Sequence, residues 1–229
     1  MTVTPTSLTR AAGISAAAAG LLFIAVQIKH PAMNVSSVTT TEWVVRQTAK
    51  TVMAAAALAG ITGMYLRQVR QMGILGLAGY LVFGFGYLVM FGVEFAGGYV
   101  LPSLAHTAPG YVSNVLAAGI GDTVHGDIGA MQTAFSLMGA GYLAGGVLFG
   151  IALYRARVLA RWASGLLVLG TLATLALRVL PHSFDRPLAV PVGIALIGLG
   201  ISLWRDQRRT SAITASDLAP AGVEPSAVR

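Results

Sequence analysis

Cysteine is absent from this sequence, and charged residues are scarce. Asp, Glu, Lys and Arg make up 10% of the chain, whereas a soluble domain carries about 25%. Without cysteine the chain cannot form a disulfide scaffold, a c-type haem attachment, a thiolate metal site or a cysteine nucleophile. With so little charge it cannot cover a water-facing surface, which excludes an ordinary soluble domain.

Apolar residues dominate instead. The 229 residues are 55% hydrophobic, and the mean hydropathy is +0.74. A helix of ~20 apolar residues crosses the ~30 Å hydrocarbon core of a bilayer. Six segments have about this length: 11–27, 51–66, 72–95, 128–154, 163–180 and 188–204. We therefore predict an all-α integral membrane bundle of six transmembrane helices within residues 1–209, with the second helix beginning near Thr41.

The basic residues are distributed unevenly between the two sides of such a bundle. Most of the 15 Lys and Arg residues fall near the two termini and in the loops on the same side. The positive-inside rule places that side, with both termini, in the cytoplasm. Topology in a plasma membrane thus explains the formal net charge of +7, and we expect no nucleic-acid partner. Residues 210–229, rich in Ala, Ser, Pro and Thr, are expected to be disordered.

Glycine recurs at a spacing of four in the segment 128–154. Gly141 and Gly145 form one pair, and Gly146 and Gly150 form another. Small residues at this spacing let helix backbones approach closely. The pattern indicates tight packing within the bundle, or a contact between copies of the chain in a homo-oligomer.

The titratable residues gather on the side opposite to both termini. All four histidines lie there, together with Glu42, Glu94, Asp122, Asp127 and Asp185. The longest loop, 96–126, is on this side and carries several apolar residues. Long loops in compact chains are usually functional or disordered. Because this one is rich in apolar residues, we expect it to pack as an ordered cap or a re-entrant segment. Any titratable site should open toward the outer half of the bilayer.

The segment 72–95 carries an aromatic stripe that ends in a carboxylate. The aromatic members are three or four residues apart and so share one helical face: Tyr80, Phe83, Tyr87 and Phe91. Glu94 continues this face at the edge of the membrane. A carboxyl group beside apolar walls keeps its proton more readily, so Glu94 is a candidate proton donor at the end of an aromatic-lined pocket. The alternative is a packing stripe, with Glu94 bonded to a loop amide or to Arg178.

Glu42, Arg46 and Lys50 follow one another at intervals of four. This spacing predicts an i,i+4 ion pair on a solvated, charged face. In the alternative interpretation, Glu42 is a second carboxylate that faces Glu94. Trp43 is expected to be an anchor at the membrane interface, and it is also a candidate lining residue of the pocket.

Asp122, His125 and Asp127 lie just before the segment 128–154. Asp127 suits the N-cap of the following helix. These three residues are also candidates for a terminal base or a reprotonation route. Asp122 and His125 could instead bind Zn or Cu together with His30, His106 or His182. Arg178 is expected to snorkel or to pair with Glu94, or else to hold an anionic headgroup or diphosphate.

Several stretches resemble a group of small six-helix actinobacterial membrane proteins, most of them without an assigned function. The resembling stretches are 10–13, 20–23, 30–31, 60–68, 93–95, 101–105 and 148–162. Together they touch most of the spans. The resemblance implies the same six-helix bundle.

In size, span number, acid and aromatic residues, the chain also resembles small membrane-embedded terpene cyclases that act on prenylated natural products. Those enzymes protonate an alkene or epoxide with an acidic side chain and steer a carbocation with aromatic rings. The resemblance implies that Glu94 is the catalytic acid and that the stripe residues stabilise positive charge by cation–π contact. It also implies a lipid-soluble isoprenoid substrate.

Two classes of function follow. The first is a membrane enzyme acting on an isoprenoid-type lipid, a proton-initiated terpene cyclase that requires no metal or other cofactor. The second is a non-enzymatic membrane protein that binds a lipid or small molecule, or a transporter subunit, in which the acids and histidines hold a ligand or sense pH. A metal or haem site at the outer histidines is a third hypothesis.

Overall fold

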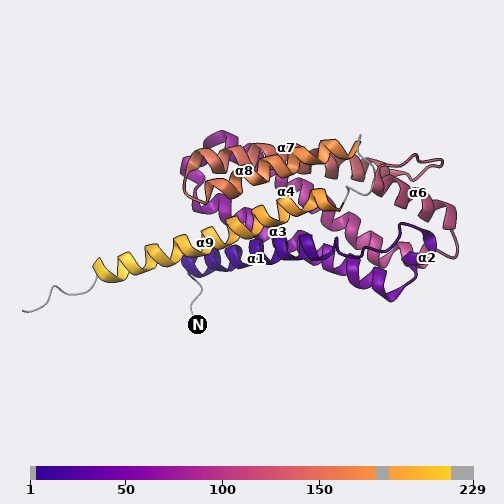
Figure 1. Cartoon of the computed structure of the whole chain (residues 1–229), viewed down its shortest axis with the longest axis horizontal. Helices are drawn as coiled ribbons and strands as arrows, with labels where there is room; N and C mark the ends of the chain where they lie inside the picture. Colours follow the sequence, from indigo (N-terminus) through magenta and orange to yellow (C-terminus); the bar gives the residue numbers. More distant parts are fainter. Residues whose placement is uncertain (1–3, 179–185, 218–229) are drawn as a thin grey trace, which may run out of the picture.

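Six helices of the described part of the chain form a closed ring. In the computed structural model, residues 4–178 and 186–217 are described, with side chains for 4–176 and 186–207, and this part of the chain is helical without strands. The ring consists of α1 (Pro5–Ala25), α3 (Thr41–Arg67), α4 (Val69–Tyr99), α7 (Ala130–Ala156), α8 (Arg161–Ala173) and α9 (Val190–Asp217). Each helix packs against the next in chain order, and α9 closes the ring against α1 (Figure 1).

Within the described ranges, five helices are long and apolar enough to cross a membrane. They are α1, α3, α4, α7 and the stretch Pro187–Gln207, which joins the short 3-10 helix η3 (Pro187–Ala189) to α9. The remaining predicted span, 163–180, is shorter than expected. There α8 runs into the 3-10 helix η1 (Thr174–Arg178), and the apolar helix covers only Arg161–Ala176. The prediction of long apolar helices is thus confirmed for five of the six segments.

Two helix boundaries bear on the sequence predictions. α3 begins at Thr41, with the Thr40 side chain accepting from the backbone N–H of Trp43, so the predicted start is confirmed. α9 continues to Asp217. The expectation of disorder from residue 210 is therefore wrong for 210–217, and 218–229 lie outside the described residues.

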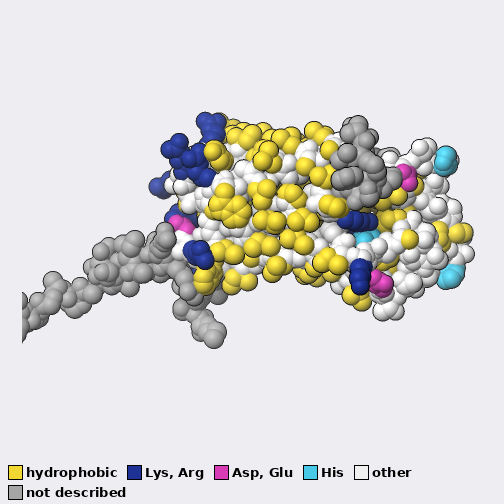
Figure 2. Space-filling view, in the orientation of Figure 1, with side chains coloured by type: hydrophobic (Ala, Val, Ile, Leu, Met, Phe, Trp, Pro, Cys, Tyr) yellow, Lys and Arg dark blue, Asp and Glu magenta, His cyan; other side chains and the backbone are white. Residues whose placement is uncertain are grey.

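The outer surface of the ring is apolar along its middle. Val52 of α3 and Leu81 and Leu88 of α4 are each more than half exposed there. In Figure 2 this apolar belt separates an end rich in Lys and Arg from an end that carries histidines. We call the end with Arg10, Arg67, Arg155 and Arg161 the basic end. Such a belt suits a protein surrounded by lipid over the middle of its length.

Close helix contacts depend on glycine. A Cβ atom on Gly86 of α4 would lie 2.7 Å from the carbonyl carbon of Gly141 in α7, and Gly145 lies against the α4 backbone in the same way. Gly146 and Gly150 face the neighbouring helix α8. The glycine pairs expected from the sequence therefore serve packing within one chain, and a homo-oligomer stays a prediction.

Three short helices cover the end opposite to the basic end. We call α2 (Val35–Val38), α5 (Leu101–Leu104) and α6 (Pro109–Ile120) the cap, and this end the cap end (Figure 1). The cap has an apolar core of its own, made of Val38, Trp43, Leu101, Val112, Val115, Leu116 and Ile128. The expectation that the long loop packs as an ordered cap is confirmed.

Gly86→Ala should destabilise the protein, because the added methyl group would press α4 away from α7. Such overpacking costs ~1–3 kcal/mol, which lowers the Tm of a chain of this size by several degrees. Gly92 of the same helix has no atom within 4 Å of the Cβ position. Gly92→Ala should leave the Tm unchanged or raise it, because alanine is the better helix former. Thermal unfolding in mild detergent compares the two variants, and equal Tm values would contradict the α4–α7 contact.

Candidate functional site

Trp43, Gln47 and Lys50 form one face of α3 at the cap end, since they are spaced four and three residues apart. Trp43 is 2% exposed and Gln47 is 6% exposed. The indole Nε1 of Trp43 donates to the carbonyl oxygen of Gly97 in α4 over 2.9 Å. Trp43 is therefore buried beneath the cap, and its expected position as an interface anchor is wrong.

Two adjacent glycines of α4 let this face come close. A Cβ atom on Gly98 would lie 2.9 Å from the Cβ of Gln47, and one on Gly97 would meet the Gln47 amide nitrogen. A larger residue at Gly98 would push α3 away from α4, and one at Gly97 would displace the Gln47 amide group. The close approach brings the side chains of Gln47 and Lys50 to Glu94.

Glu94 is held by both of these residues. The amide Nε2 of Gln47 donates to Oε2 of Glu94 over 2.9 Å, and the Lys50 ammonium lies 3.5 Å from the same oxygen. The Lys50 and Glu94 side chains are 13% and 17% exposed. Both contacts use Oε2, so Oε1 of Glu94 keeps its capacity to accept. The Gln47 Oε1 atom is buried and has no hydrogen-bond partner among the described residues.

The surroundings of Glu94 thus differ from the prediction, which placed its carboxyl group beside apolar walls. The cation that faces it comes from α3, far away in the sequence. Gln47 and Lys50 were not among the residues predicted for the site, although their spacing from Trp43 is a signal that could have found them. The expected alternative partner, the Arg178 side chain, lies outside the described residues.

A cavity of about 90 Å³ lies where α3 and α4 meet the cap and α7. Gln47, Lys50 and Glu94 supply its polar wall. Most of the remaining lining is apolar and includes Trp43, Phe135 and Met138 among other residues. The cavity has room for a few water molecules or one small polar group, but it is well below the ~300–1,000 Å³ of a typical ligand pocket.

The aromatic stripe lies elsewhere. Phe83 and Tyr87 are fully buried in the core of the bundle, and the Phe83 ring packs against Tyr142 of α7 with centroids 5.9 Å apart. Tyr80 stacks on Tyr65 of α3 with centroids 4.6 Å apart. Phe91 is partly buried against the same core. None of the four stripe residues lines the cavity at Glu94, so the stripe serves packing in this structure.

A larger groove of about 520 Å³ lies beyond two residues of the cavity wall. Phe135 and Met138 line both the cavity and the groove. The groove continues along α7 and reaches Met90 of α4 and Leu175 of η1. The polar cavity and a groove that has the size of a ligand site therefore adjoin at Phe135 and Met138.

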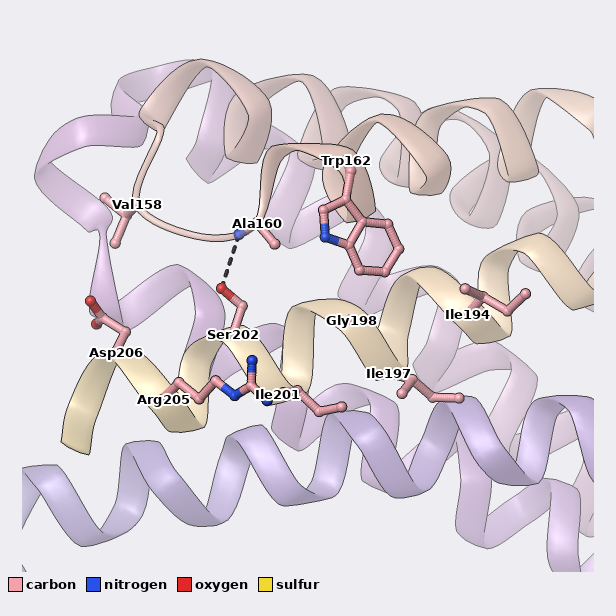
Figure 3. A pocket seen from close by; sticks show the side chains of 10 residues that line it. All are labelled: Val158, Ala160, Trp162, Ile194, Ile197, Gly198, Ile201, Ser202, Arg205 and Asp206. Atoms are coloured by element: carbon pink, nitrogen blue, oxygen red, sulfur yellow. Dashed lines mark hydrogen bonds between the residues drawn. The ribbon is translucent and has the colours of Figure 1, made fainter. Parts of the chain in front are cut away.

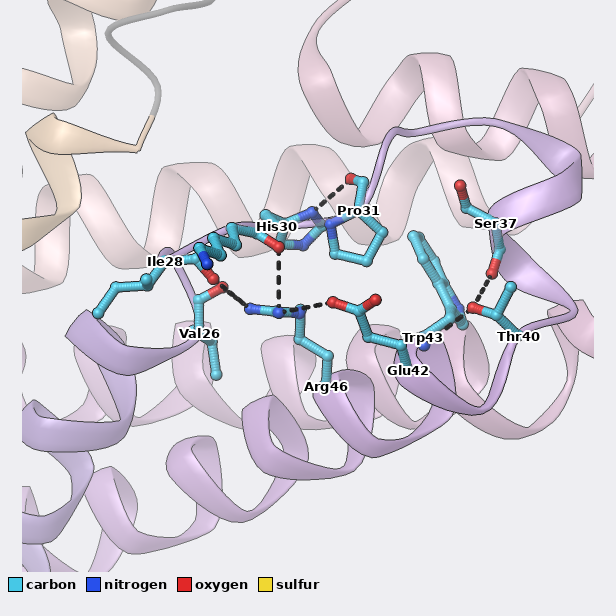
Figure 4. A network of polar contacts seen from close by, with 10 residues as sticks. Val26, Ile28, His30, Pro31, Ser37, Thr40, Glu42, Trp43 and Arg46 are labelled. Carbon is cyan, nitrogen blue, oxygen red and sulfur yellow. Dashed lines mark hydrogen bonds and ion pairs between the residues drawn. The ribbon is translucent and has the colours of Figure 1, made fainter.

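Arg46, on an adjacent face of α3, holds the end of α1. Its guanidinium donates to three carbonyl oxygens there, those of Val26, Ile28 and Lys29 (Figure 4). It also pairs with Glu42 at 2.9 Å, which confirms the predicted i,i+4 ion pair. Glu42 is 62% exposed and pairs with Arg46 instead of facing Glu94. The interpretation as a solvated face is wrong, because the Arg46 and Lys50 side chains are 17% and 13% exposed.

Asp122, His125 and Asp127 lie exposed in the link before α7 and do not line the cavity. Oδ1 of Asp127 accepts from the backbone N–H of Gly129 over 2.7 Å. Gly129 is the N-cap of α7, so the predicted N-cap role of Asp127 is wrong. Among the described residues, no group of three His, Asp or Glu could hold a metal ion. His182 and Asp185 lie outside that part of the chain.

No family model, no curated protein and no solved structure matches this chain. The resemblances to small actinobacterial membrane proteins and to terpene cyclases therefore remain hypotheses based on the sequence. The function has to be inferred from the geometry of the site.

His30 lies beneath the cap, edge-on to Trp43 with ring centroids 6.2 Å apart. Its Nδ1 is 2.8 Å from the carbonyl oxygen of Pro31. Burial lowers the pKa of His30 from 6.5 to about 4, and the positive charges of Lys50, Arg186 and Arg46 act in the same direction. The imidazole is therefore neutral near neutral pH.

Folding stability should fall as the pH drops from 6.5 toward 4. The unfolded chain binds a proton at His30 in this range, whereas the folded chain does not, so acid favours unfolding. His30→Gln should reduce this pH dependence, and His125→Gln, at an exposed histidine, should not. Thermal unfolding over this pH range measures both. The same pH dependence in the wild type and in His30→Gln would contradict the assignment.

Proposed function

We propose that this protein is a multi-pass plasma-membrane protein that binds a lipid-soluble molecule carrying a small hydrogen-bonding group. One observation carries the proposal: Gln47, Lys50 and Glu94 converge on a cavity whose other walls are mostly apolar. Small-molecule sites usually combine apolar walls with a few placed polar groups. The basic end favours a cytoplasmic location for both termini, which would put the cavity in the outer half of the bilayer.

The polar wall indicates the chemistry of the bound group. In the part of the chain that the structure describes, the buried Gln47 Oε1 has no hydrogen-bond partner, and an acceptor left unsatisfied in this way costs ~1–3 kcal/mol. A ligand O–H or N–H would satisfy it, and Oε1 of Glu94 can accept a second such bond. The Lys50 ammonium can donate to a ligand oxygen. A hydroxyl, amide or amine group fits this arrangement.

The cavity and the groove would each hold a different part of the ligand. The cavity of about 90 Å³ accepts only the polar group, whereas the groove of about 520 Å³ accepts an apolar body. Phe135 and Met138 stand between them. A rotamer change of these side chains would join the two spaces, and methionine adapts readily to such changes. An isoprenoid chain that ends in a polar group is the ligand class that suits both parts.

Gly119→Leu should remove a bound ligand without unfolding the protein. Gly119 lines the cavity, and a Cβ atom there would make ordinary contacts of 3.7 Å with Met33 and Phe135. The rest of a leucine side chain would then occupy the cavity. Gly110, also in α6, has no atom within 4 Å of the Cβ position, so Gly110→Leu is the matched control.

Native mass spectrometry of protein purified in mild detergent measures the outcome. We expect a co-purifying small molecule in the wild type and in Gly110→Leu, and its loss from Gly119→Leu at an unchanged Tm. Equal ligand occupancy in the two variants, or a wild-type protein that takes up no isoprenoid alcohol when it is added, would contradict the proposal.

A proton-initiated cyclase is the second candidate function. It is favoured by the position of the Glu94 carboxyl on a cavity lined by Trp43 and Phe135. The small volume of this cavity and the cation at Lys50 favour binding instead. Recovery of an added polyprenyl alcohol unchanged would support the binding protein. Its conversion to a cyclic isomer, lost in Glu94→Gln, would support the enzyme.

A further inference from the structure

A separate groove of about 460 Å³ opens between α8 and α9 at the basic end (Figure 3). Its floor follows one face of α9 and contains Ile194, Ile197 and Ile201. These residues span about two helical turns, or roughly 10 Å along the helix. The groove shares no residue with the cavity at the cap end. It therefore offers an independent apolar surface that is long enough for part of a hydrocarbon chain.

Trp162 forms one wall of this groove and is 61% exposed. Its indole lies toward Gly198 of α9, where a Cβ atom would be 2.7 Å from Cζ2 of the indole (Figure 3). Gly198 thus lets the indole lie close to α9. Tryptophan in this position is typical of the boundary between hydrocarbon and headgroups.

The polar edge of the groove contains the cation of Arg205. Arg205 is exposed, and within the described residues it forms no hydrogen bond or ion pair. The nearby Asp206 is already engaged by Nε of Arg67 at 2.6 Å. Ser202 accepts from the backbone N–H of Ala160 over 2.9 Å, so its hydroxyl proton can be donated to another acceptor.

We propose that this groove binds an anionic phospholipid. The Arg205 guanidinium and the Ser202 hydroxyl would bind the phosphate, since the arginine fork matches phosphate oxygens. One acyl chain would lie along Ile194, Ile197 and Ile201, with Trp162 at the level of the glycerol backbone. The apolar floor is what selects a bilayer lipid over a free phosphate ion. The surplus of arginine at the basic end supplies the charge complementarity.

The experiment uses the full chain in mild detergent and native mass spectrometry. Phosphatidylglycerol and phosphatidylcholine with the same acyl chains are titrated separately. We expect the wild type to bind phosphatidylglycerol more tightly. Arg205→Gln should weaken phosphatidylglycerol binding roughly tenfold, because it removes a charge-assisted contact with the phosphate. Arg205→Lys, which keeps the charge but loses the fork, should give an intermediate affinity.

Arg70→Gln is the matched control. Arg70 is also an exposed arginine at the basic end, and it does not line the groove. Its replacement removes the same charge and should leave phosphatidylglycerol binding within about twofold of the wild type.

Three results would overturn the proposal. An equal loss of phosphatidylglycerol affinity in Arg70→Gln and Arg205→Gln would mean that the lipid is held only by general attraction to the positive charge of the basic end. Equal affinity for the two lipids would mean that the groove does not select an anionic headgroup, because phosphatidylcholine carries the same phosphate with its charge neutralised by choline. Competition by glycerol phosphate at a concentration equal to that of the lipid would mean that a soluble phosphate, rather than a bilayer lipid, is the ligand.

Discussion

The close approach of α3 and α4 at Gly97 and Gly98 is the constraint on which the site depends. With no side chain at these positions, Gln47 lies directly against α4 and the Trp43 indole reaches the Gly97 carbonyl oxygen. One helical turn further along, Lys50 then meets Glu94. A partly buried carboxylate and ammonium are costly to desolvate, and each partly offsets that cost for the other. The glycines therefore place the charges, and the pairing of the charges makes their burial tolerable.

The cap completes the site from the other side. The apolar core of the cap packs around Trp43. This packing fixes both the end of α3 and the position of the cap. The bundle core next to it is filled by interlocking aromatic rings such as Phe83, Tyr87 and Phe149. The cavity, by contrast, has adaptable methionines in its walls. A rigid aromatic core beside a wall that can rearrange suits the proposed function, in which the site would admit a ligand from the membrane.

Much of the architecture could be predicted from local patterns. Hydropathy located the five long helices, and the apolar residues of the loop 96–126 indicated the cap. The same patterns did not predict contacts between segments that are far apart in the sequence. The spacing of Tyr80, Phe83 and Tyr87 defines a helical face, but it does not say that α3 and α7 cover that face. Glu94 and Gln47 are 47 residues apart in the sequence, so no pattern within one helix reveals the contact.

The coupling between Lys50 and Glu94 tests the central claim most directly. A double-mutant cycle would compare the free energies of unfolding of the wild type, Lys50→Met, Glu94→Gln and the double variant in one detergent. Each single change leaves a partly buried charge without its partner, whereas the double change removes both charges. We expect the double variant to be more stable than the sum of the single losses predicts, by about 1 kcal/mol or more. Losses that add within about 0.5 kcal/mol would show that the two side chains do not interact, and would contradict the site described above.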